Sequence, residues 1–311
     1  MLVFIAFLVL LGAGFDRFFL GYSGTSLPVG TLAALALGTG SAMFSYYGGD
    51  RAVLLSSHAQ PLEAREAAAQ TDAEKFKLTQ LDNVVDEMAI AAGLPKPKVY
   101  VIPDADPNAF ATGRDPAHAS LAVTQGLLDR LDREELQGVV AHEMSHIRNY
   151  DIRLMMIVAA LVGAIVLLSD WGANGLWWGG GRRRNSDEGG GGAIGAVMFA
   201  VWIIGIILAP IIGQLLAMMV SRRREYLADA SGAELTRNPL GLARALQDID
   251  SAAEPTKLIS RGTAHLCIAD PLGRALGDKE HAAAELFATH PPIAQRIARL
   301  REMAYQSQGG H

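Results

Sequence analysis

Two histidines and a glutamate form the part of the sequence whose chemistry is easiest to infer. His142, Glu143 and His146 make the pattern H-E-x-x-H within VVAHEMSHIR (139–148). Histidines four residues apart on a helix project about 40° apart, so both imidazoles can reach one metal ion. Glu143 is rotated by about 100° from His142 and can reach a water molecule on that metal without binding the metal itself. This arrangement predicts a zinc-dependent peptidase.

The predicted chemistry assigns separate roles to the metal and to Glu143. Zinc would polarise the scissile carbonyl group, and Glu143 would act as general base and later pass a proton to the leaving amine. The competing interpretation is a surface helix with two solvated histidines. Apolar neighbours argue against it, because they place the helix in the core, where unpartnered imidazoles are costly. These neighbours are Val139, Val140, Ala141, Met144 and Ile147.

A catalytic zinc site needs a third protein ligand and keeps its fourth position for water. Glu225 in SRRREYLAD (221–229) is favoured, because Asp229 follows it by one helical turn. Glu225 would bind the metal, and Asp229 would accept the free ring N–H of a liganding histidine. The alternative is an ordinary charge cluster beside a membrane. Other candidates by residue type are the downstream histidines His265, His281, His290 and His311.

The composition indicates that part of the chain is embedded in a membrane. Half of the 311 residues are hydrophobic and only 19% are charged, whereas soluble domains usually carry about 25% charged residues. Two of the four apolar runs are shorter than the roughly 20 residues of a span, and for these a buried core helix is the alternative. The runs are Leu2–Phe15, which we extend to Leu20, Leu27–Gly48, Leu154–Ser169 and Ala193–Val220.

The last two runs explain why the third ligand lies so far along the chain. Of the 78 residues between His146 and Glu225, 67 (154–220) belong to these runs and the segment that joins them, which includes the glycine-rich connector WWGGGRRRNSDEGGGG (177–192). An antiparallel hairpin returns the chain to the membrane face that it left. Only eleven residues outside the hairpin then separate the two ligands. We therefore expect a zinc site just outside the bilayer.

The soluble segments predict a mainly helical domain with a small β-sheet. Apolar spacing indicates helices over 78–92, 224–235, 241–249 and 293–303. Strands are expected in KVYVI (98–102), NAFATG (108–113) and SLAVT (120–124). Asp132 and Glu135 make a capping box before the motif helix, and Asp151 is a candidate cap for a new helix after it.

The fold class is therefore α+β, with four transmembrane helices added to the soluble domain. The expected organisation is two transmembrane helices in 1–50, the first part of the catalytic domain in 51–153, a membrane hairpin in 154–220 and the second part in 221–311. The net charge of −5 argues against a nucleic-acid partner. A single cysteine, Cys267, excludes an intramolecular disulfide and a cysteine-rich zinc cluster.

Six collinear segments resemble the HtpX-type membrane zinc metallopeptidases, which are related to the CaaX prenyl protease of eukaryotes. The segments are GLPKPKVYVI (93–102), NAFATG (108–113), LAVTQGLLDRL (121–131), ELQGVVAHEMSHIRNYD (135–151), REYLAD (224–229) and THPP (289–292). The resemblance implies a zincin-like catalytic domain with one Zn²⁺ per chain, held by His142, His146 and Glu225, and Glu143 as general base. It also implies an integral protein of the bacterial inner membrane whose cytoplasmic domain cleaves membrane or unfolded polypeptides, often damaged ones.

The resemblance also implies how substrate is bound. NAFATG is similar to an edge strand that pairs with the substrate backbone, a mode in which main-chain hydrogen bonds supply affinity for many sequences. Asn108 and Phe110 are then substrate-binding residues, and His290 would donate a hydrogen bond to the tetrahedral oxyanion. The alternatives are a turn asparagine for Asn108 and a helix-start histidine for His290.

Arginines near the predicted spans favour a cytoplasmic catalytic side under the positive-inside rule. They are more numerous on the catalytic side, although Arg17 and the triplet 182–184 lie on the other. Two alternatives to a broad membrane endopeptidase stay open. One is a non-catalytic membrane scaffold with a structural metal site, against which the intact Glu143 argues. The other is an enzyme confined to one substrate, such as a prenylated tail.

Overall fold

The structure is a computed structural model that describes residues 9–10, 12–17, 27–155, 222–252, 258, 266–269 and 291–308. The chain divides into two compact units. The first comprises Met1–Tyr46 and Ile157–Leu216, and the second comprises Tyr47–Met156 and Ala217–His311. All of the predicted site residues that the structure describes belong to the second unit.

In the first unit, a buried carboxylate caps the helix α2, which covers Val29–Ser56 and begins in this unit. Asp16 is 1% exposed, and it accepts hydrogen bonds from the amides of Gly30 (2.6 Å) and Thr31 (2.9 Å) and from the Thr31 hydroxyl (2.7 Å). A negative side chain at a helix N-terminus satisfies free amides and interacts favourably with the helix dipole. Asp16, which interrupts the first apolar run, is therefore a helix cap.

Membrane spans can be assessed only for the described residues, and there no single helix is both long and apolar enough to cross a bilayer. Val29–Phe44 and Tyr46–Ser56 meet the length and composition criteria only together, as a bent pair. The predicted hairpin and its connector lie outside the described residues, except for Leu154 and Met155. The prediction of four transmembrane helices is thus not confirmed.

The second unit contains a four-stranded sheet in the order β1-β2-β4-β3. β2 and β4 are parallel, and the other neighbouring pairs are antiparallel. The strands are β1 (Gln60–Pro61), β2 (Lys98–Ile102), β3 (Ala109–Gly113) and β4 (Ala119–Thr124). The three predicted strands are confirmed to within one residue, whereas β1 was not predicted. β3 lies at the edge of this sheet.

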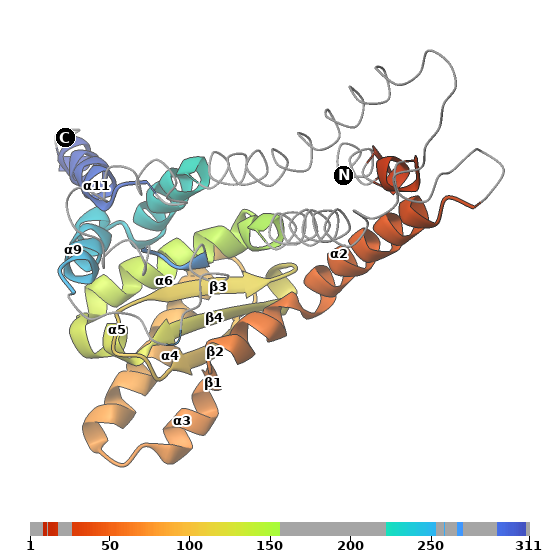
Figure 1. The fold of residues 1–311 in the computed structure, drawn as a ribbon. Coiled ribbons are helices and arrows are strands. Elements are labelled where there is room, and N and C mark those ends of the chain that lie inside the picture. Colours follow the sequence, from red (N-terminus) through yellow and green to blue (C-terminus); the bar gives the residue numbers. More distant parts are fainter. Residues whose placement is uncertain are drawn as a thin grey trace. The chain divides into compact units, whose positions relative to one another are not determined.

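Helices pack around this sheet, and α6 (Arg133–Arg148) carries the motif. It begins with the predicted capping box, in which Asp132 and Glu135 each accept a hydrogen bond from the other's amide (2.9 Å). α6 contacts both β3 and α9, so it runs between the sheet and the C-terminal helices (Figure 1). The other helices are α3 (Leu62–Ala68), α4 (Asp72–Ala92), α5 (Gln125–Arg130), an unlabelled helix over 222–236, α9 (Pro239–Asp250) and α11 (Ile293–Gln308).

Two glycines let other helices approach α6 backbone to backbone. A Cβ added to Gly138 would lie 2.7 Å from the backbone nitrogen of Leu242 on α9. A Cβ added to Gly232, on the 222–236 helix, would lie 3.0 Å from the backbone nitrogen of His142. The second approach brings the helix that carries Glu225 and Asp229 directly against the motif.

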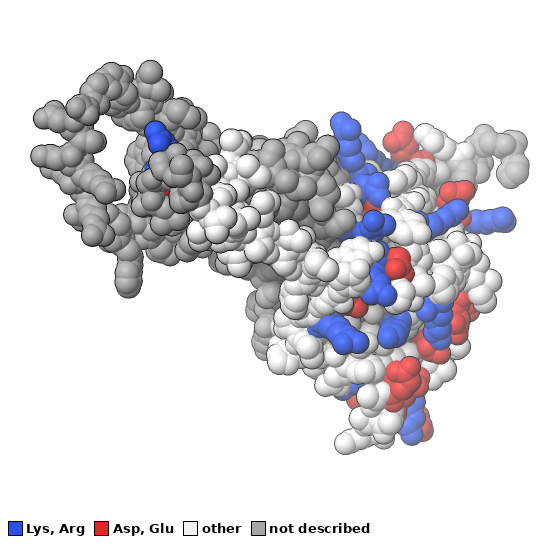
Figure 2. All heavy atoms as spheres, turned by 90° about the vertical axis from the view of Figure 1, so that its right-hand side faces the viewer, with Lys and Arg blue, Asp and Glu red and all other residues white. Residues whose placement is uncertain are grey.

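The surface charge of the second unit is mixed. On the face that Figure 2 shows, Lys and Arg side chains are interspersed with Asp and Glu side chains. Apolar side chains fill the interior in two clusters, of which the larger includes α4, α6, α9 and one face of the sheet. The smaller cluster includes Phe110 and Ile102 together with Leu266 and Cys267.

The contact at Gly138 gives a stability prediction. Gly138→Ala should lower the free energy of unfolding by about 1–3 kcal/mol, because overpacking forces the two backbones apart. Thermal or denaturant unfolding in detergent measures this change. Gly40→Ala is the matched control, since a Cβ there meets no atom within 4 Å. Equal stability of the two variants would contradict the close approach.

Candidate metal centre and active site

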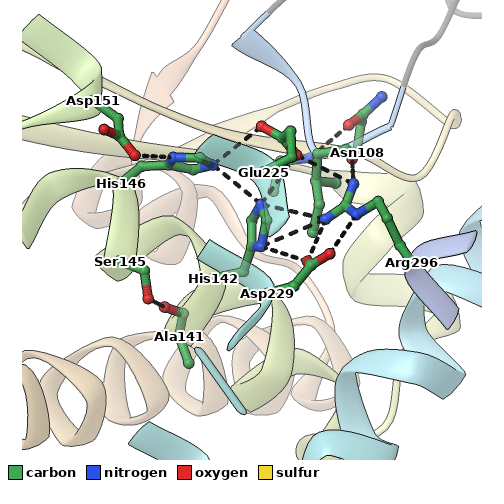
Figure 3. Close-up of polar contacts among 11 residues, drawn as sticks. Asn108, Ala141, His142, Ser145, His146, Asp151, Glu225, Asp229 and Arg296 are labelled. Atoms are coloured by element: carbon green, nitrogen blue, oxygen red, sulfur yellow. Dashed lines mark hydrogen bonds and ion pairs between the residues drawn. The ribbon is translucent and has the colours of Figure 1, made fainter. Parts of the chain in front are cut away.

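The two motif histidines face each other on one side of α6. Their Nε2 atoms are 3.2 Å apart, and their ring centroids are 4.7 Å apart. Both side chains are buried, with His142 0% and His146 5% exposed. The helical spacing of four therefore directs both imidazoles to one point, as the sequence predicts (Figure 3).

Glu225 completes a three-residue set from a separate helix. Its Oε2 lies 3.6 Å from the Nε2 of His142, and its Oε1 lies 3.4 Å from the Nε2 of His146. One ligand atom from each of the three residues lies within 4.8 Å of the others. Ligand atoms about 2.1 Å from zinc in a tetrahedral site are roughly 3.4 Å apart. The donor types, burial and spacing thus fit zinc.

Each imidazole donates its other ring nitrogen's proton to a carboxylate. His142 Nδ1 is 3.0 Å from Asp229 Oδ1, and His146 Nδ1 is 3.0 Å from Asp151 Oδ2. Although burial opposes the charged imidazolium, hydrogen bonds to Asp229 and Glu225 raise the pKa of His142, and Glu225 likewise raises the pKa of His146. Carboxylates that stabilise a proton at this point also stabilise a metal cation, which displaces that proton.

Arg296 on α11 is a central residue that the sequence analysis missed. Its side chain is 0% exposed and donates two hydrogen bonds to Asp229, of 2.9 and 2.7 Å, and one of 2.6 Å to the carbonyl of Ile268. Its Nη1 is also 3.3 Å from Glu225 Oε2. Burial alone raises the pKa of Asp229, but the Arg296 guanidinium outweighs this effect and holds that pKa below its ordinary value.

A signal for Arg296 was present in the sequence. Ile293, Ile297 and Leu300 mark the apolar face of the last helix, and Arg296 falls on that same face. A charged residue on a face that packs into the core must be paired there, so it indicates buried partners of opposite charge.

Glu143 lies beside the three-residue set but outside it. Its side chain is 1% exposed, and neither carboxylate oxygen has a hydrogen-bond partner among the described residues. Burial raises its pKa, and the charges of His142 and His146 oppose this rise. The backbone amide of Ala111 on β3 also lowers the pKa of this carboxylate. This carboxylate is therefore free to accept a proton.

The remaining predicted site residues have different surroundings. Asn108 is fully buried beside the site, and its Nδ2 donates to the carbonyl of Ala269 (3.1 Å). The Phe110 side chain is also fully buried and belongs to the smaller apolar cluster. Its role in substrate binding stays a prediction, and in this structure the aromatic ring fills the core. His290 lies outside the described residues.

Comparison with known proteins identifies the family. Residues 76–304 match the model of peptidase family M48. The chain belongs to this family. As an M48 member it is a metallopeptidase, and the family relationship implies a bound metal, usually zinc. The predicted resemblance to HtpX-type peptidases is confirmed by curated relatives.

Several M48 relatives named "Protease HtpX homolog" match most of the chain. The one from Caldanaerobacter subterraneus subsp. tengcongensis is 47% identical over 236 residues, 76% of this chain and 75% of the relative. The Pediococcus pentosaceus protein is 54% identical over 221 residues, 71% and 72% of the two chains. The Lactobacillus helveticus protein is 40% identical over 305 residues, 97% and 95% of the two chains.

A solved structure supports the fold. The crystal structure of S. mikatae Ste24p superposes with a TM-score of 0.52 at 19% sequence identity. The match covers 95% of this chain and 62% of Ste24p. At this identity the likeness concerns the fold alone, and it agrees with the predicted zincin-like domain.

The burial of Arg296 predicts a large effect on stability. Arg296→Leu should lower the free energy of unfolding by about 3–5 kcal/mol, because it leaves the buried carboxylates of Asp229 and Glu225 without their cation. Denaturant unfolding of the purified chain measures this loss. Arg301→Leu is the control, because Arg301 is exposed on the same helix and, among the described residues, hydrogen-bonds to Gln247 alone. This substitution should lower the free energy of unfolding by less than about 1 kcal/mol. Equal losses of unfolding free energy in the two variants would contradict the role of Arg296 as the buried cation beside Asp229 and Glu225.

Proposed function

We propose that this M48 peptidase is a membrane-bound endopeptidase that holds one Zn²⁺ per chain through His142, His146 and Glu225. The observation that carries the proposal is the convergence of three buried ligand atoms within 4.8 Å of one another. Glu143, buried next to them without a hydrogen-bond partner among the described residues, is the proposed general base. A structural zinc site has no use for such a base, which speaks against a non-catalytic scaffold.

The side chains around the metal centre divide the catalytic work. Bound zinc would polarise the scissile carbonyl and lower the pKa of a water molecule. Glu143 accepts the proton of the attacking water and later delivers a proton to the leaving amine. Asp229 fixes the ring orientation and the tautomer of His142, so that its Nε2 faces the other two ligand residues. Arg296 keeps the buried Asp229 carboxylate charged.

We further propose that the chain is an integral protein of the bacterial inner membrane and that its substrates are membrane or unfolded polypeptides. The support is the set of four apolar runs and the excess of arginines on the catalytic side, which favours a cytoplasmic site. A hairpin over 154–220 would place the metal centre beside the bilayer, where a membrane protein could enter it.

Substrate would bind by adding a strand to the outer edge of β3. The carbonyl of Ala109 points away from β4, because it accepts a hydrogen bond from the Ile268 amide (2.9 Å). Backbone groups two residues apart in a strand face the same side, so those of Ala111 also point outward. The approach of the Ala111 amide to the Glu143 carboxylate agrees with this orientation. An added strand would therefore run past the general base.

In this structure the chain's own segment Leu266–Ala269 contacts that edge. Besides the bond to Ala109, the carbonyls of Ile268 and Ala269 accept hydrogen bonds from Arg296 and Asn108. A substrate backbone on β3 would need the same edge groups. Substrate and segment therefore compete, and we propose that the segment moves away when substrate binds.

The proposed chemistry is tested by metal analysis and a cleavage assay on the detergent-solubilised full chain. Glu143→Gln should retain about one zinc per chain and lose about 10²–10⁴-fold in cleavage rate of an unfolded protein, because only the proton transfer is removed. His146→Ala should lose the zinc itself. A Glu143→Gln protein that cleaves at the normal rate would contradict the mechanism. Wild type with zinc but no chelator-sensitive cleavage would support a scaffold instead.

The proposed movement is tested with the single cysteine of the chain. Cys267 lies in the contacting segment and is 1% exposed, so its thiol should react slowly with a maleimide reagent. An excess of unfolded polypeptide added to the zinc-loaded Glu143→Gln protein should accelerate labelling about tenfold or more. The matched control is the same protein without polypeptide. If labelling stays unchanged while fluorescence shows that polypeptide binding is saturated, the segment is a fixed part of the fold and the proposed movement is wrong.

A further inference from the structure

Asp151 is a buried carboxylate with two partners of different kinds. It is 0% exposed, and its Oδ2 lies 3.0 Å from Nδ1 of His146. Its other oxygen, Oδ1, forms an ion pair with Arg224. Arg224 also donates a hydrogen bond of 2.8 Å to the carbonyl of Asn149. One arginine thus holds both the Asp151 carboxylate and the end of the motif helix.

The two residues come from opposite sides of the long stretch 156–221. α6 ends at Arg148, and Tyr150 takes a left-handed conformation (φ 57°) that turns the chain before Asp151. Asp151 therefore lies five residues before that stretch, and Arg224 lies three residues after it, next to Glu225. Their ion pair joins the two ends of the stretch directly behind His146.

We propose that Asp151 and Arg224 form a positioning pair that holds the His146 ring in the geometry for metal binding. The inference rests on the proposed zinc site and adds residues that act through His146. Asp151 accepts the Nδ1 proton and so leaves Nε2 for the metal. Arg224 is needed because it holds the second oxygen of this buried carboxylate, and without that ion pair the carboxylate could turn away from His146.

The ion pair also connects the metal centre to the two ends of the 156–221 stretch. Any displacement that separates the ends of the 156–221 stretch also breaks the pair and releases the His146 ring. The metal centre is therefore sensitive to how the two ends of this stretch are held together. In the proposed membrane topology, these ends are the base of the hairpin.

A double-mutant cycle on zinc affinity tests the pair. Zinc affinity of the full chain in detergent is measured by competition with a chromogenic chelator for wild type, Asp151→Asn, Arg224→Gln and the double variant. Each single change should weaken binding about 10–100-fold, the usual cost of losing an outer partner of a metal ligand. The double variant should bind about as weakly as the weaker single variant, because both changes remove one interaction.

Controls separate positioning from loss of structure. Arg133→Gln removes an exposed ion pair between the start of α6 and Glu87 on α4, and it should leave zinc affinity within about twofold. Arg224→Lys, which keeps the charge, should recover most of the affinity if the variant melts like wild type. Cleavage by the zinc-saturated variants should show a reduced kcat with little change in KM.

Two results would overturn the inference, and they are distinguishable. If wild type binds zinc and Arg224→Gln binds it equally well, or if the two losses multiply in the double variant, the positioning pair is wrong while the proposed function stands. If wild type itself binds no zinc, the proposed function fails and the positioning pair fails with it.

Discussion

Burial of charge beside two imidazoles is the constraint on which the rest of this structure depends. Glu143, Glu225, Asp229 and Asp151 are all nearly inaccessible to water, and isolated carboxylates in such a place are very costly. Arg296 and Arg224 offset part of that charge through direct ion pairs. Since carboxylates still outnumber these two arginines, the arrangement favours a further cation. The preference for a metal ion follows from this excess of buried negative charge. The same excess requires that the charged side chains be held rigidly in place.

The fold holds these side chains rigidly by placing α6 between elements from distant parts of the chain. β3 passes on one side and brings the Ala111 amide to Glu143. On another side the 222–236 helix approaches α6 so closely that a Cβ at position 232 would lie 3.0 Å from the backbone nitrogen of His142. Each outer carboxylate also has its own arginine from another segment. The site is therefore assembled by long-range contacts, and its geometry depends on the packing of the whole second unit.

The sequence predicted the features that depend on local chemistry. The capping box at Asp132, the strand Lys98–Ile102 and the convergence of His142 with His146 follow from spacing alone. Sheet order and the parallel pairing of β2 with β4 did not, because they depend on contacts between segments far apart in the chain. Asp151 was interpreted as a helix cap, since nothing near it in the sequence shows that its carboxylate faces His146. Arg296 was missed because the carboxylates with which it pairs, Asp229 and Glu225, lie 67 or more residues away.

The edge of β3 combines two requirements that conflict. An unpaired strand edge invites pairing with other chains, and proteins usually cover or shorten such edges. Leu266–Ala269 covers part of this one, and the backbone bond between Ile268 and Ala109 satisfies one outward carbonyl. A peptidase that binds unfolded polypeptide by strand addition needs the same edge to be accessible. A short covering segment that moves away when substrate binds would reconcile the two, because a long substrate strand could take its place and form further hydrogen bonds along β3. Covering the edge with the chain's own backbone would then favour extended, unfolded polypeptides over folded ones, since only the former present a free strand.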